Sequence, residues 1–144
     1  MSGILPVVRP VQADTPTVHL KRLHAEVRDT IRGYEGVVGQ AEADDAAVLQ
    51  AFLDLHRRHH PELDRIMAAH ALEPDEKGGA SAGARDLEGE GRALPRLLER
   101  ERRISETYGE LLAEGNPDDV IEVLERQQDE LTALIDRYEA QRGA

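Results

Sequence analysis

Apolar residues recur along most of this chain at alternating intervals of three and four positions, the spacing of one face of an α-helix. The first stripe predicts a helix over about residues 16–42, and the second predicts a helix over about 45–72. Two further stripes predict helices over about 93–114 and 117–142. The pattern therefore predicts an all-α fold, a four-helix bundle over residues 16–142.

The link between the last two predicted helices contains both a stop signal and a start signal. Gly115 favours a helix end, and Asn116 and Pro117 fit the N-cap and the first position of the next helix. Asp118 and Asp119 then supply acidic charge in its first turn, where the helix dipole favours it. The first two helices are also joined by a short link, so each pair is expected to form an antiparallel hairpin.

The middle connection, residues 73–92, is long and rich in glycine and charge. About twenty residues at ~3.3 Å each can reach ~60 Å, whereas a helix of about 25 residues is ~38 Å long. The connection can therefore cross the whole bundle and make the second and third helices parallel, as in ferritin-like bundles. A long surface loop is the alternative. Residues 1–15, with Pro6 and Pro10, are expected to form an extended tail.

Composition narrows the classes of partner. The net charge is −11 with a pI near 4.9, so the chain lacks the basic footprint of a nucleic-acid-binding protein, and anionic membrane surfaces are disfavoured. No apolar run approaches the ~20 residues that span a bilayer. Cysteine is absent, which fits a reducing compartment, so the chain is expected to be cytoplasmic.

The stretch HRRHHPELD, residues 56–64, raises the possibility of a metal site. Di-iron centres of ferritin-like proteins take a Glu-x-x-His pair from each of two helices. No histidine of this chain has an acidic residue three positions before it, which argues against that centre. A haemerythrin-like site with histidines on all four helices is disfavoured too, because no histidine follows His70. His56 and His60 lie at the edges of the apolar stripe and are expected on the surface.

Three stripe positions carry polar side chains: His59, Glu101 and Gln127. A buried carboxylate needs a partner. A divergent site for iron or another divalent metal, formed by His59, Glu62 and Glu101, would provide one. The alternative, which we favour, is a neutral hydrogen-bond network in the core that joins these positions to two tyrosines. Its members would be Glu101, His59, Tyr34, Tyr108 and Gln127.

Glycines recur at every third position of the first predicted helix, at Gly33, Gly36 and Gly39. Each lowers helix stability by about 1 kcal/mol relative to alanine. They could allow close approach of another helix, within the bundle or across a dimer, or they could mark a loosely formed helix. The pattern leaves both interpretations open.

Three segments together resemble a bacterial family of ferritin-like four-helix proteins known only as a domain of unknown function. The segments are DTIRGYEGVVGQAE, LERERRISETYGELL with Glu101 and Tyr108, and VLERQQDELTALIDRY with Arg126, Gln127 and Asp136. The resemblance covers about residues 17–140 and implies a ferritin-like bundle without an established activity. The family's pattern often has a histidine before that aspartate. This chain has Ile135 there, so a ligand would be lost.

Nothing in the chain resembles a nucleophile with its base, a phosphate-binding loop or a catalytic pair of carboxylates. The favoured hypothesis is therefore a non-catalytic ferritin-like bundle that acts in protein association, as a homo-oligomer or with a protein partner, or in a stress-related role. The divergent metal-binding protein is the alternative. A third hypothesis is a helical sensor or adaptor that contacts its partner through residues 1–14 and 73–92.

Overall fold

The computed structural model describes residues 18–75 and 93–143, and within these ranges the chain is almost entirely helical. The prediction of an all-α four-helix bundle is confirmed. The predicted tail, residues 1–15, and most of the long connection lie outside the described residues. In chain order the elements are α2 (Val18–Val37), the short 3₁₀ segment η1 (Val38–Gln40), α3 (Ala43–Ala69), α5 (Ala93–Leu112) and α6 (Asp118–Gly143).

The first helix is shorter than the stripe predicted. α2 ends at Val37 and continues only as the 3₁₀ turn η1, whereas the pattern predicted a helix up to residue 42. Gly36 and Gly39 are both exposed, and no atom lies within 4 Å of where a side chain would begin on either. The glycines therefore weaken the α-helix without any close helix contact in return, and the last turn adopts the tighter form.

The link between α5 and α6 ends one helix and starts the next, as predicted, but with a different role for Asn116. Gly115 has the left-handed φ of 76° that ends helices. The side-chain amide of Asn116 donates a 2.7 Å hydrogen bond back to the carbonyl of Leu111, while its buried Oδ1 has no hydrogen-bond partner among the described residues. The predicted N-cap role is therefore wrong: Asn116 satisfies the end of α5 instead.

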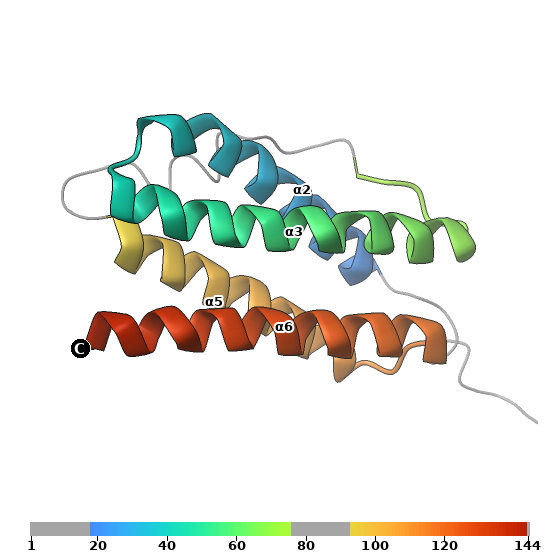
Figure 1. Cartoon of the computed structure of the whole chain (residues 1–144). Helices are drawn as coiled ribbons and strands as arrows, with labels where there is room; N and C mark the ends of the chain where they lie inside the picture. Colours follow the sequence, from blue (N-terminus) through green and yellow to red (C-terminus); the bar gives the residue numbers. More distant parts are fainter. Residues whose placement is uncertain (1–17, 76–92, 144) are drawn as a thin grey trace, which may run out of the picture.

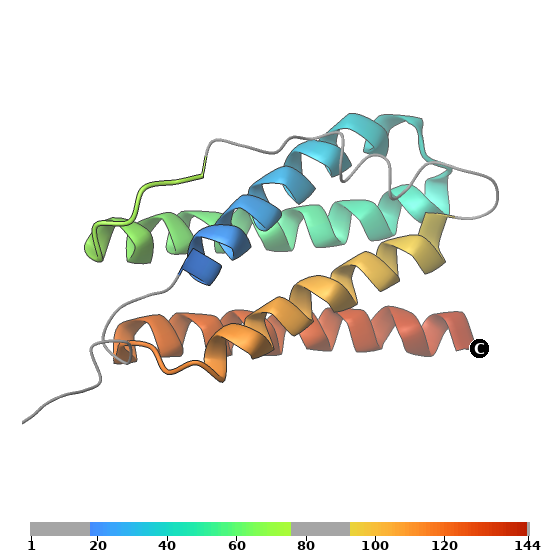
Figure 2. The same ribbon diagram turned by 180° about the vertical axis from the view of Figure 1, so that it is seen from behind.

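The four helices pack as two antiparallel hairpins, α2 with α3 and α5 with α6 (Figure 1). α3 also packs against α6, and α2 against α5, so α3 and α5 lie diagonally opposite each other (Figure 2). Both α3 and α5 begin at the same end of the bundle and are parallel (Figures 1 and 2). A connection that crosses the length of the bundle stays a prediction, because residues 76–92 lie outside the described residues.

The core contains the predicted stripes together with buried apolar residues beside them, such as Leu49, Leu53 and Leu97. The apolar members of the stripes are either fully buried or pack against the buried cluster. Among the described residues, no helix is long and apolar enough to span a membrane. The fully buried apolar residues of the stripes include Leu20, Leu23, Val27, Phe52, Leu63, Leu98, Ile104, Leu111, Val120, Leu124 and Leu131.

Candidate functional site

A buried polar seam runs through the middle of this apolar core, and Glu101 of α5 is at its centre. The Glu101 side chain is 0 % exposed. Tyr34 of α2 donates its hydroxyl to Glu101 Oε2 at 2.5 Å. His56 Nε2 lies 2.8 and 3.0 Å from the two carboxylate oxygens. These distances are those of hydrogen bonds, so the buried Glu101 carboxyl group has partners on both α2 and α3.

The position of His56 corrects the sequence prediction, which placed it on the surface. The ring is 0 % exposed and lies among the core residues of α3. A helix that faces neighbours on two sides buries an apolar stripe wider than the narrow row of Phe52, Leu55 and His59. His56 follows Phe52 by one helical turn and lies within that wider face, which the narrow row left out.

A second layer of the seam joins α3, α5 and α6. Tyr108 donates its hydroxyl to Gln127 Oε1 at 2.7 Å. Gln127 Nε2 in turn donates to the backbone carbonyl of His59 at 3.1 Å and to Glu62 Oε1 at 2.9 Å. Burial raises the pKa of Tyr108 far above its usual value, so the hydroxyl remains a donor. Gln127 therefore has partners for both ends of its amide.

The three residues predicted as metal ligands have separate partners in the structure. His59 Nε2 lies 2.7 Å from Glu130 Oε1, and burial lowers the pKa of His59, a shift that the Glu130 bond partly offsets. Glu62 accepts a hydrogen bond from Arg126 at 2.5 Å, which lowers the pKa of Glu62. Glu101 has Tyr34 and His56. Among the described residues, His59, Glu62 and Glu101 do not come together as a set of close ligand atoms.

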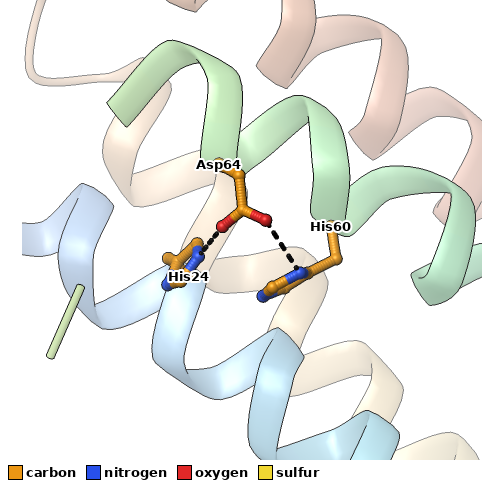
Figure 3. Close-up of side chains that lie close together, drawn as sticks. All are labelled: His24, His60 and Asp64. Atoms are coloured by element: carbon orange, nitrogen blue, oxygen red, sulfur yellow. Dashed lines mark hydrogen bonds and ion pairs between the residues drawn. The ribbon is translucent and has the colours of Figure 1, made fainter. Parts of the chain in front are cut away.

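A different set of residues does come together, between α2 and α3 (Figure 3). His24 of α2 and His60 and Asp64 of α3 each offer one ligand atom, and these atoms lie within 4.8 Å of one another. His24 is 2 % exposed, and burial lowers the pKa of His60, although the charge of Asp64 opposes this shift. His60 was predicted on the surface and is instead half-buried.

The histidines of the stretch HRRHHPELD thus contact three different helices that pack against α3. His56 contacts α5, His59 contacts α6, and His60 with Asp64 faces α2. The spacing of four between His60 and Asp64 is visible in the sequence and indicates a shared helix face. Their meeting with His24 depends on how α2 is aligned along α3, which the spacing does not contain.

An open groove follows the outer surface between α3 and α6. Its floor is formed by Ala51, Leu55, Ala133 and Leu134. Charged side chains from both helices border it, an acidic and a basic residue on each: Asp54 and Arg58 on α3, Glu130 and Arg137 on α6.

Comparison of the chain with protein-family models, with curated proteins and with solved structures found no match. The resemblance to a ferritin-like family therefore stays a prediction.

Proposed function

We propose that this chain is a non-catalytic, ferritin-like helical bundle that acts through protein association, and that it forms a homodimer through the α3/α6 groove. The observation that carries the proposal is the charge arrangement around that groove. Two antiparallel hairpins with parallel α3 and α5 support the ferritin-like topology. The hydrogen bonds among the seam residues support a structural role for the interior. The lack of cysteine supports a cytoplasmic location.

Two contacts fix how α3 and α6 are aligned along the groove. His59 pairs with Glu130, and the rings of Phe52 and Tyr138 lie 5.9 Å apart. Because the helices are antiparallel, Arg58 lies level with Glu130. Asp54 lies between these two contacts on α3, within about two residues of the level of Arg137 on α6.

A two-fold axis parallel to the groove would place α3 of each copy against α6 of the other. Arg58 would then face the second copy's Glu130, and Asp54 would face the second copy's Arg137. The groove is in this way complementary to itself, as a two-fold interface requires. Arg58 makes no hydrogen bond or ion pair within the described chain, and Arg137 only lies over the ring of Tyr138.

Sedimentation analysis of charge-reversed variants tests this proposal. The wild-type protein is expected to have twice the 16.0 kDa chain mass. Arg137→Glu should shift it to the monomer, because two acidic residues would then face each other, and the double variant Asp54→Arg/Arg137→Glu should restore the dimer. Arg32→Glu is the matched control, since Arg32 is an exposed residue of α2 that, like Arg137, has no carboxylate partner among the described residues, and α2 lies on the diagonal opposite α6. A wild-type protein that is monomeric at all concentrations would refute the proposal.

A metal site within the seam is the second candidate function, and one observation favours it. The buried Nδ1 atoms of His56 and His59 have no hydrogen-bond partner among the described residues. Such a site would use Glu101 with His56, in addition to the predicted His59 and Glu62, for iron or another divalent metal. Glu101→Gln should abolish metal uptake in that case, and unchanged uptake would exclude the seam.

A further inference from the structure

We propose that His24, His60 and Asp64 form a binding site for one divalent transition-metal ion of the zinc class, which links α2 to α3. All three residues are shown in Figure 3. The site is separate from the buried seam around Glu101 and from the α3/α6 groove. The proposed metal site therefore does not depend on the proposed dimer.

The geometry of the cluster is already close to that of a metal site. Asp64 Oδ1 lies 2.5 Å from His24 Nε2, and Asp64 Oδ2 lies 3.5 Å from His60 Nδ1. The two imidazole rings are side by side, with centroids 4.5 Å apart. Ligand atoms about 2.1 Å from a tetrahedral ion are about 3.4 Å from each other. Small side-chain rotations would therefore bring all three ligands onto one ion.

Both imidazoles can offer a lone pair to this ion. His24 Nδ1 and His60 Nε2 are buried and have no hydrogen-bond partner within the described residues. Such a second hydrogen bond would normally fix which ring nitrogen carries the proton. Without it, each ring can carry its proton on the far nitrogen and offer the lone pair of the nitrogen beside Asp64 to the ion.

The surroundings leave Asp64 available to the histidines. The positive charges of Arg28 and Arg32 of α2 contribute to lowering the pKa of His60. Arg28, however, donates to the carboxylate of Asp29 at 3.1 Å and to the backbone carbonyl of Asp75. The Asp64 side chain is 53 % exposed, so an ion can reach it from solvent.

The donor set identifies the class of ion. Two imidazoles and one carboxylate suit Zn²⁺, Co²⁺, Ni²⁺ or Cu²⁺, whereas Mg²⁺ and Ca²⁺ prefer sites made of oxygen atoms. Three protein ligands leave a fourth tetrahedral position for water. Because the ligands come from two helices, the bound ion would hold α2 against α3 and stabilise the folded state.

Titration of Zn²⁺ into the tag-free full chain, followed by calorimetry, tests the site. We expect one ion per chain and no competition from an equal concentration of Mg²⁺. Asp64→Asn and His60→Gln should each weaken binding by about 100-fold or more, since even the loss of an outer-shell partner costs 10- to 100-fold. His70→Gln is the matched control, because His70 also pairs with a carboxylate, Asp119 at 2.9 Å, but without a second histidine. Its affinity should equal that of the wild type.

Nitrogen NMR of the histidine rings in the wild-type protein gives a readout that needs no substitution. Zn²⁺ should move the ring signals of His24 and His60 and leave that of His56 unchanged. Zn²⁺ should also raise the unfolding temperature of the wild type but not of Asp64→Asn. Equal binding by wild type, Asp64→Asn and His60→Gln would overturn the proposal, as would no binding at all. Loss of binding in Glu101→Gln alone would overturn it too, and would place the ion in the seam.

Discussion

At the residue scale, the stability of the interior depends on the pairing of His56 with Glu101. His56→Leu would leave the buried Glu101 carboxylate with only the Tyr34 hydroxyl, and removal of one partner of a buried pair costs about 3–5 kcal/mol. Adding Glu101→Gln should recover part of that loss, because no buried charge would remain and the amide oxygen still accepts from Tyr34. Urea unfolding at neutral pH measures both free energies of unfolding.

The control for this prediction is His70→Leu. His70 follows the last residue of α3 and pairs with the exposed carboxylate of Asp119, so this change should alter the free energy of unfolding by less than about 1 kcal/mol. A double variant less stable than His56→Leu would show that Glu101 carries no uncompensated charge. The sequence predicted burial of Glu101, Tyr34 and Gln127 because they occupy stripe positions. It missed His56, which lies on the edge of the stripe, and His24, whose partners come from another helix.

At the scale of single elements, helix existence and most helix ends were predictable from local signals, because stripes and caps act within a few residues. The C-terminal part of the first helix was not, since the competition between α-helix and 3₁₀ turn depends on small propensity differences at Gly36 and Gly39. Within the chain, no side chain or backbone of another helix lies close to Gly36 or Gly39, so these two glycines do not serve close packing inside the bundle. Close approach across a dimer stays a prediction.

Gly36→Ala should therefore stabilise the protein by about 0.5–1 kcal/mol, because alanine loses less backbone entropy in a helix and meets nothing within 4 Å. Thermal unfolding followed by circular dichroism measures the change. Gly109→Ala in α5 is the informative comparison, since its methyl group would lie 3.4 Å from the Gln128 amide and should yield a smaller gain. Destabilisation by Gly36→Ala would indicate a close contact at that face, as in an assembly through α2.

At the scale of the whole molecule, the antiparallel hairpins followed from short links, but the alignment of neighbouring helices did not. Alignment depends on how many side chains interlock along each interface, and no single spacing records that sum. This alignment brings His24 next to Asp64. It also places Arg58 level with Glu130 along the bundle. The sequence pattern therefore could not predict the candidate sites that lie between helices.

Because α3 and α5 are parallel, the connection between them is expected to need a minimum length, and this requirement can be tested directly. α5 has 20 residues and is about 30 Å long at ~1.5 Å per residue. With residues 76–92 deleted, only residues 70–75 would join the two helices, and they reach at most about 20 Å at ~3.3 Å per residue. This variant should fail to form a four-helix bundle within one chain. It should either unfold, as seen by circular dichroism, or form bundles by exchanging helices between chains, so that sedimentation finds no folded monomer even at concentrations where the wild-type dimer dissociates. Replacement of residues 76–92 by a glycine–serine segment of equal length should keep the wild-type helix content, because length alone is required. A deletion variant that is a folded monomer under those conditions would instead mean that α3 and α5 can pack antiparallel.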